Sequence, residues 1–178
     1  MDITNWVDEQ KEKYPEANTE ILKFIGKTAS WNTDKDTEYK NTPECFFSSG
    51  YCYYFAVMLQ HLFEGELMWH KFHSHIVFTD KNNVSYDAHG VFDDYADGEL
   101  LPLDLLSDTD LKLFRHIGEF SEQEVKEGNL ETAMNVLEYE IMYGASQNNI
   151  EISQNMVNKM LDKLNSNIAR VNTMETNR

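Results

Sequence analysis

The chain is poor in basic side chains and in long apolar runs. It carries 31 acidic residues against 15 lysines and arginines, a formal net charge of −16, which argues against direct binding to a nucleic-acid backbone. No run reaches the roughly 18 apolar residues that a membrane span needs. The first residues carry acids and lysines where a signal peptide would be apolar. These absences predict a cytoplasmic protein that binds neither nucleic acid nor a membrane directly.

Cysteine is scarce as well. Cys45 and Cys52 are the only two in the chain, and two cysteines cannot form a disulfide framework for a protein of this length. In a reducing compartment we expect both to be free thiols or metal ligands, and each is therefore a candidate for chemistry.

Apolar residues, in contrast, are plentiful enough for one sizeable core. With 41% hydrophobic residues in 178, we expect a single domain over residues 1–170 and a frayed tail over 171–178. Helical spacing predicts N-terminal helices before Pro15 and from Asn18 onward, and C-terminal helices from Ser121 and Ser153. Residues 51–63 are apolar nearly all round, which predicts a buried central helix.

Short extended segments follow this apolar stretch. Residues 67–71, 73–78 and 84–89 are predicted strands, and the last two are joined by the polar turn TDKNN. The acid-rich residues 91–102 are predicted to form a loop. The predicted fold class is α+β, with a central apolar helix packed on a small antiparallel sheet and flanked by N-terminal and C-terminal helices.

The register of the predicted hairpin decides which side chains meet. If TDKNN is a five-residue loop, Phe78 pairs with Val84 and His75 lies opposite Asp87. A four-residue loop would instead place His75 and Asp87 on opposite faces. In the expected register, one face collects more imidazole and carboxylate groups than packing requires, namely His73, His75, His89 and Asp87.

Cys52 has a setting that favours reactivity. It follows Gly50 at the expected N-terminus of the apolar helix, where free N–H groups and the helix dipole favour a thiolate. A neighbouring imidazole can take the thiol proton, and a carboxylate on its other nitrogen holds the ring's tautomer and orientation. Cys52, His75 and Asp87 are the candidates for these three roles. Backbone N–H groups near Cys52 are candidates for stabilising an oxyanion.

The order of motifs around these residues resembles a known family. Gly50-x-Cys52-x-x-Phe55-Ala56 is followed by His75-Ile76-Val77 and then by Tyr86-Asp87-Ala88-x-Gly90-Val91. This order is similar to the Cys-His-Asp core of the papain-like and transglutaminase-like superfamily, most of all to its small bacterial and phage members. The resemblance covers residues 48–92.

The resemblance implies a fold and a function. It implies a cysteine-bearing helix packed on an antiparallel sheet, with Cys52 as catalytic nucleophile, His75 as base and Asp87 as orienting acid. The implied activity is acyl transfer on a protein or peptide substrate, of the peptidase, amidase or transamidase type. An active enzyme and an inactive descendant of one are both compatible with it.

A zinc site is a competing interpretation of the same residues. Thiolate, imidazole and carboxylate groups are all zinc ligands, and this stretch offers more than the four that a tetrahedral site requires. Neither a C-x-x-C pair nor an H-E-x-x-H helix accompanies them. In this alternative the metal ligands come from His73, His75, His89 and Cys52.

Acidic residues are concentrated between positions 80 and 110, where nine acids accompany one lysine. A solvated loop face is the simpler interpretation. The functional alternative is an acidic phage inhibitor of the anti-CRISPR kind, which imitates a nucleic-acid backbone and occupies a basic, nucleic-acid-binding host protein. The candidate partner-binding residues are Asp93, Asp94, Asp97 and Glu99.

Overall fold

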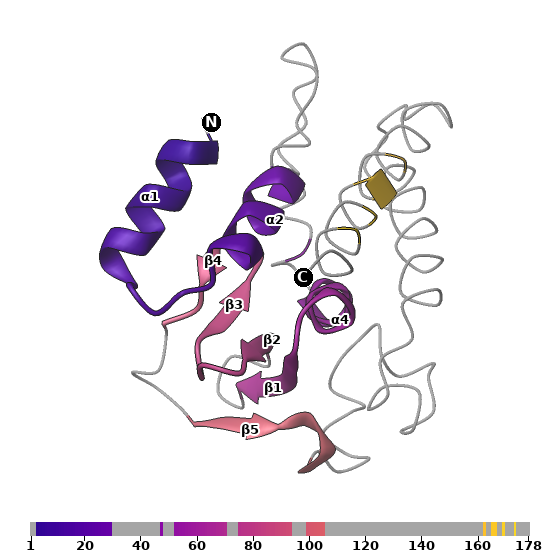
Figure 1. Ribbon diagram of the computed structural model, residues 1–178. Coiled ribbons are helices and arrows are strands. Elements are labelled where there is room, and N and C mark those ends of the chain that lie inside the picture. The colour runs from indigo at the N-terminus through magenta and orange to yellow at the C-terminus, as the bar shows by residue number, and fades with distance from the viewer. Residues whose placement is uncertain are drawn as a thin grey trace, which may run out of the picture.

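The structure, a computed structural model, describes residues 3–29, 47, 52–70, 75–93 and 99–105, together with positions 162, 165, 166, 169 and 173. Its helices pack on a small antiparallel sheet (Figure 1), so the chain is of the α+β class, as expected. In the part described, no helix is long and apolar enough to cross a membrane. The elements are α1 (Ile3–Lys13), α2 (Thr19–Ala29), α4 (Cys52–Leu62), β1 (Gly65–His70), β2 (His75–Asp80), β3 (Ser85–Asp87), β4 (Gly90–Val91), β5 (Leu100–Pro102) and the 3-10 helix η1 (Leu103–Leu105).

Five antiparallel strands form the sheet in the order β4-β3-β2-β1-β5. Val91 of the edge strand β4 and the whole of the other edge strand, β5, lie in the stretch 91–102 that was expected to be a loop, and the expectation is wrong at these residues; residues 92, 93 and 99 lie outside the strands, as expected. Segments of two or three residues are too short to show an alternating pattern in the sequence. Pro102 fits an edge strand, because proline cannot donate to a central ladder.

The N-terminal helices begin and end near the expected residues. Asn18 caps α2, because its Oδ1 accepts hydrogen bonds from the backbone N–H groups of Glu20 at 2.9 Å and Ile21 at 3.5 Å. α1 packs against α2 at Gly26, where an added Cβ would lie 3.1 Å from side-chain atoms of Ile3 and Trp6. The pair therefore approaches closely enough to bury the apolar face of α2.

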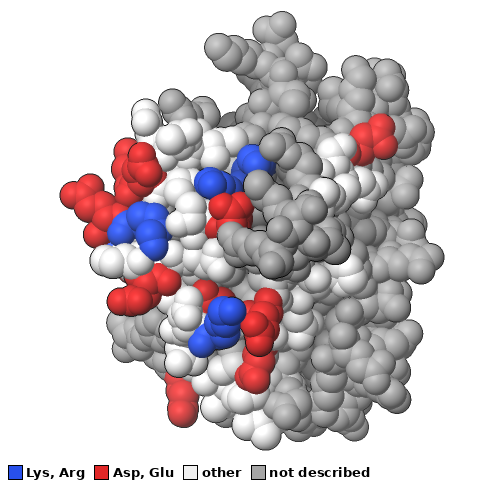
Figure 2. All heavy atoms as spheres, viewed as in Figure 1, with Lys and Arg blue, Asp and Glu red and all other residues white. Residues whose placement is uncertain are grey.

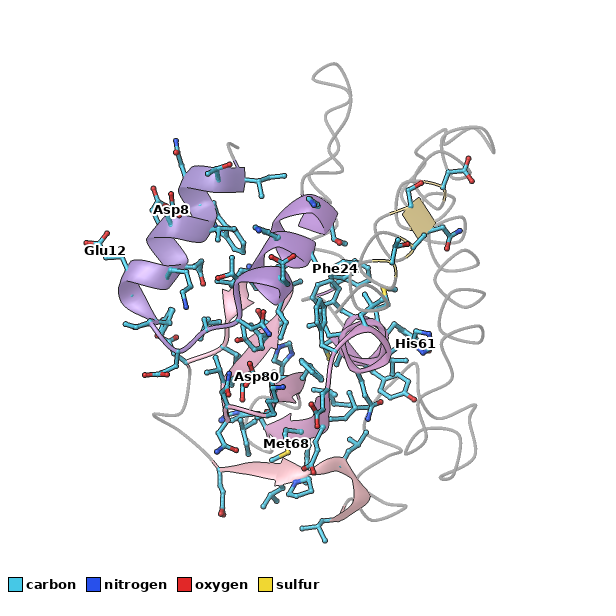
Figure 3. The ribbon with its side chains drawn as sticks, in the orientation of Figure 1. Asp8, Glu12, Phe24, His61, Met68 and Asp80 are labelled. Carbon is cyan, nitrogen blue, oxygen red and sulfur yellow. The ribbon has the colours of Figure 1, made fainter. Side chains whose placement is uncertain are left out.

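α4 is the central helix that the apolar run predicts. It packs chiefly on β2 and also contacts β1 and β3, and eight consecutive residues from Cys52 to Leu59 are buried. Phe24 points from α2 toward α4 (Figure 3) and stacks on Phe55 with ring centroids 6.4 Å apart. His61 points away from the sheet. Cys52, the first residue of α4, is buried and contacts β2 through the backbone N–H of Ile76.

The β2–β3 hairpin has a different register from the one expected. Phe78 pairs with Tyr86 rather than Val84, because the loop comprises only residues 81–83 and is closed by Asp80 N–H donating to the Val84 carbonyl at 2.9 Å. Asn83 ends the loop with φ 61°, a left-handed conformation that asparagine tolerates. The shift is two residues, so side-chain alternation is unchanged and His75 stays on the same face as Asp87.

A buried carboxylate, Asp80, shortens this loop. Its Oδ1 accepts hydrogen bonds from the backbone N–H groups of Asn82 at 2.9 Å and Val84 at 3.0 Å. Its Oδ2 accepts one from the Tyr86 hydroxyl at 3.1 Å, and that hydroxyl in turn accepts the N–H of Asn18 at 2.6 Å. The hairpin and the start of α2 are therefore tied together through one tyrosine.

Several sequence predictions concern residues outside the described ranges. The boundary at residue 170 lies outside the described residues, and of the tail 171–178 the structure describes Thr173 alone, which is helical. The others lying outside are Cys45, His73, Asp94, Asp97 and the helix expected from Ser121. Of the helix expected from Ser153, positions 162, 165, 166 and 169 are described, and they are helical.

Candidate functional site

His75 and Asp87 form a side-chain pair across the hairpin. His75 is the first residue of β2 and Asp87 the last of β3, and His75 Nε2 lies 3.0 Å from Asp87 Oδ2. Both side chains are largely buried, at 14% and 12% exposure. Asp87 Oδ1 also accepts the backbone N–H of His89 at 2.8 Å. The carboxylate is therefore held at both oxygens and presents a fixed acceptor to the imidazole.

Cys52 completes the group from a different element. It is a free thiol with 7% exposure at the first residue of α4. Its Sγ accepts a hydrogen bond from the backbone N–H of Ile76, the residue after His75, at 3.5 Å. Because Asp87 lies at Nε2 of the ring, Nδ1 is the nitrogen left for another partner. The thiol and the His75–Asp87 pair are thus brought to the same end of β2.

This position changes the acidity of His75. Burial lowers its pKa, but the hydrogen bonds and charges of Asp87 and Cys52 outweigh burial and raise the pKa from 6.5 to about 9. The imidazole therefore carries a proton at neutral pH. A thiolate–imidazolium pair requires a protonated imidazole beside the cysteine, and the raised pKa of His75 favours this protonated form.

The start of α4 adds a favourable electrostatic setting. The first backbone N–H groups of a helix have no partner within it, and they give that end a partial positive charge. The first turn of α4 contains no acidic side chain that would oppose this charge. Negative charge on Cys52 Sγ, or on an oxygen bound beside it, is therefore stabilised at this end of the helix.

Two further residues lie beside the site: His70, which the sequence offers only as one of the possible zinc donors, and Phe92, which was assigned no role. His70 is fully buried and pairs directly with His75 in the β1–β2 register. Phe92 places its ring centroid 5.5 Å from that of His75 and 5.6 Å from that of His70. No sequence signal marks Phe92, because it lies in the stretch that was expected to be a loop.

The residues of the zinc alternative are not all described. His89 is exposed, and its backbone is bound to Asp87. Among the described side chains, no group of three or more histidines, cysteines and acids could hold a metal ion. His73 lies outside those ranges, so zinc binding stays a prediction.

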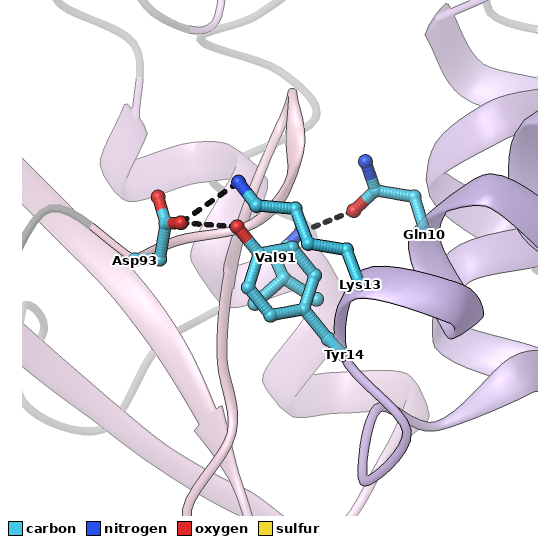
Figure 4. Close-up of polar contacts among 5 residues, drawn as sticks. All are labelled: Gln10, Lys13, Tyr14, Val91 and Asp93. Atoms are coloured by element: carbon cyan, nitrogen blue, oxygen red, sulfur yellow. Dashed lines mark hydrogen bonds and ion pairs between the residues drawn. The ribbon is translucent and has the colours of Figure 1, made fainter.

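The proposed acidic surface is likewise only partly described. Asp93 accepts hydrogen bonds from the Tyr14 hydroxyl and from Lys13 Nζ, the latter at 3.0 Å, and these two bonds lower its pKa (Figure 4). Glu99 is exposed. On the face drawn in Figure 2, lysines lie between the acidic side chains. Asp93 therefore has a structural use within the fold.

Comparison of the chain with protein-family models, with curated proteins and with solved structures gave no match in any of the three. The resemblance to the papain-like and transglutaminase-like superfamily therefore stays a prediction. The geometry of the site brings a thiol, an imidazole and a carboxylate together from three elements: His75 hydrogen-bonds Asp87, and the Cys52 sulfur is bound to the backbone of the residue after His75.

Proposed function

We propose that the protein is a cysteine hydrolase or transamidase, with Cys52 as nucleophile, His75 as acid and base, and Asp87 as the residue that orients His75. The observation that carries this proposal is that the largely buried imidazole of His75 lies 3.0 Å from the Asp87 carboxylate, while the sulfur of Cys52 is bound to the backbone of the next residue, Ile76. Packing alone requires no such arrangement. Nucleophilic catalysis does, because the base must be held in one tautomer and orientation.

The chemistry follows from the protonation states of the three groups. The Cys52 thiolate attacks the carbonyl carbon of an amide or thioester in a protein or peptide, and the N–H groups at the start of α4 stabilise the oxyanion. The His75 imidazolium gives its proton to the leaving group, which departs and leaves a thioester on Cys52. Water or an amine then attacks the thioester. His75 takes the proton of this second nucleophile, and Cys52 is released as thiolate.

Asp87 supports both half-reactions without reacting. Its Oδ2 lies 3.0 Å from Nε2 of His75, and a carboxylate there favours the tautomer with the proton on Nε2, which leaves Nδ1 free to act as base. The bond from His89 N–H to Oδ1 stops the carboxylate from rotating away. Side-chain exposures of 14% and 12% limit competition from water for the pair.

Alkylation with iodoacetamide at pH 6, followed by peptide mass mapping, tests the proposal. A thiol without an imidazolium partner reacts slowly at that pH, because its ordinary pKa is about 8.5. We expect Cys52 to react at least about tenfold faster in the folded protein than in the denatured chain. Replacing His75 with Gln removes this advantage. The control His61→Gln changes an exposed histidine of α4, the helix that carries Cys52, and should leave the faster alkylation unchanged.

A second measurement separates an active enzyme from an inactive descendant. Incubation with an activated ester and intact-mass analysis detects an acyl group on the protein, which is absent in Cys52→Ala. Alkylation together with acylation supports the proposed function. Equal alkylation of folded and denatured protein at pH 6 contradicts the thiolate–imidazolium pair, and rapid alkylation without any acylation contradicts acyl-transfer activity.

A further inference from the structure

The aromatic ring of Phe92 lies against the histidine of the proposed site. Its centroid is 5.5 Å from that of His75, with 40° between the ring planes, and 5.6 Å from that of the neighbouring His70. The polar groups facing His75 are Cys52 from α4, His70 from β1 and Asp87 from β3. Phe92, from the segment after β4, adds an apolar surface beside this polar set.

The short segment that carries Phe92 is anchored at three consecutive residues. Val91 N–H donates to Gln10 Oε1 of α1 at 3.1 Å, and Phe92 N–H donates to the Ser85 carbonyl at 2.8 Å. The Asp93 carboxylate binds Lys13 at 3.0 Å and also Tyr14 (Figure 4). Two of these three anchors come from α1, although α1 itself contributes no residue to the proposed triad.

The close contact between α1 and β4 depends on Gly90. Its φ of +120° is a backbone conformation that residues other than glycine rarely adopt, and an added Cβ would lie 2.6 Å from Gln10 Oε1. The lack of a side chain at Gly90 thus allows Gln10 of α1 to lie against the backbone next to Phe92. Neither the edge of the sheet nor the triad alone requires that approach.

We propose that Phe92 is a positioning residue for His75, and that α1 and the residue after it hold Phe92 in place through Gln10, Lys13 and Tyr14. An imidazole on a strand end can rotate about its side-chain bonds, and a ring packed against it restricts this rotation. The same contact keeps water from the His75–Asp87 hydrogen bond, which strengthens that bond. The inference rests on the proposed function, since it names what orients the base of that site.

The test compares Phe92→Ala with Phe92→Tyr, which keeps an aromatic ring. The control is Phe63→Ala, because Phe63 is also a partly buried aromatic but packs on Phe24, away from His75. The first readout is the titration midpoint of the His75 ring, measured by NMR. The second is the rate of Cys52 alkylation at pH 6, with circular dichroism to establish that each variant is folded.

We expect Phe92→Ala to release the ring from Asp87 and Cys52, so that the His75 midpoint moves down by about one pH unit or more toward its ordinary value. Alkylation at pH 6 should fall at least about fivefold, because fewer molecules hold the thiolate–imidazolium pair. Phe92→Tyr and Phe63→Ala should stay within about twofold of the wild type. If Phe92→Ala does not fold, Phe92→Leu keeps the apolar volume without a planar ring, and the same readouts apply.

The contribution of Gln10 and Tyr14 is tested with Gln10→Ala combined with Tyr14→Phe. Together these changes remove the hydrogen bond to Val91 and the tyrosine hydrogen bond to Asp93, one on each side of Phe92. We expect the same direction of change as in Phe92→Ala, at less than its full size. Glu12→Gln is the matched control, because Glu12 is exposed on the outer side of α1 (Figure 3).

The outcomes distinguish this inference from the proposed function. An ordinary His75 midpoint in the wild type overturns both, because there is then no oriented pair. A raised midpoint in the wild type that is unchanged in folded Phe92→Ala overturns only the positioning role of Phe92. A change in Phe92→Ala without any change in the double variant overturns only the contribution of α1.

Discussion

His75 and Asp87 are twelve residues apart in the chain, and their side chains meet 3.0 Å apart across the β2–β3 hairpin. They are not directly opposite in the ladder, because Phe78 pairs with Tyr86 and places Asp87 diagonally to His75. Diagonal neighbours on one face are within reach of long side chains. The contact between His75 and Asp87 therefore depends on the register of the hairpin and on the identity of both residues.

Asp87→Asn should leave the fold intact and impair the site. The amide still fits between His75 and His89, but it no longer carries the charge that favours the imidazolium and the required tautomer. We expect alkylation of Cys52 at pH 6 to fall toward the rate in the denatured chain, and any acyl transfer to fall by at least about 100-fold. Asp8→Asn, a change at an exposed residue of α1, is the control. Unaltered rates in Asp87→Asn would show that the carboxylate has no role in the chemistry.

The raised pKa of His75 predicts how stability depends on pH. The folded-state value of about 9 lies above the unfolded value of 6.5, so the folded protein binds a proton more tightly. The resulting stabilisation is fully present below pH 6.5 and is lost as the pH rises to about 9. Its upper limit is about 3 kcal/mol, from 1.36 kcal/mol for each pKa unit.

Urea unfolding at pH 6 and pH 9.5 measures this loss. His75→Gln should be less stable than the wild type at pH 6 and should approach it at pH 9.5. The comparison of the two proteins removes contributions from other titrating groups. Parallel stability curves for the wild type and His75→Gln would contradict a raised pKa.

Gly90→Ala should loosen the contact between α1 and the edge of the sheet. The Cβ would overlap Gln10 Oε1 at 2.6 Å, and the backbone would keep an unfavourable φ of +120°. We expect a loss of about 1–3 kcal/mol in the free energy of unfolding. Adding Gln10→Ala should recover part of the loss by removing the clash, so the two changes should not be additive in a double-mutant cycle.

Asp80→Ala should destabilise the hairpin more than removal of an exposed acid does. It leaves the N–H groups of Asn82 and Val84 and the hydroxyl of Tyr86 without their acceptor. A loss of about 2–4 kcal/mol in unfolding free energy is expected, compared with less than about 0.5 kcal/mol for Asp8→Ala. A lowered His75 midpoint in the folded variant would further show that the short loop sets the position of the strand that carries Asp87. Equal stabilities for the two variants would rule out the structural role of Asp80.

Much of this fold can be predicted from local patterns, and the remainder has identifiable causes. Helical spacing and the Asn18 cap locate α1, α2 and α4, because these signals lie within one element. The hairpin is predicted, but its register is wrong by two residues. The buried Asp80 shortens the loop through bonds to the backbone and to Tyr86, and Tyr86 also binds Asn18 from another element. Because these contacts join residues of different elements, the sequence pattern within one element does not reveal them.

The sequence by itself determined that His75 and Asp87 share a face if their loop has an odd number of residues, because strand side chains alternate with a period of two. The structure decided that the loop has three residues. The sequence also determined that Cys52 begins an apolar helix. Only the tertiary structure decided that this helix delivers the sulfur to His75, and that α1 holds Phe92 beside the ring. Such contacts join residues far apart in the chain, and they arise only when the helices and the sheet pack against one another.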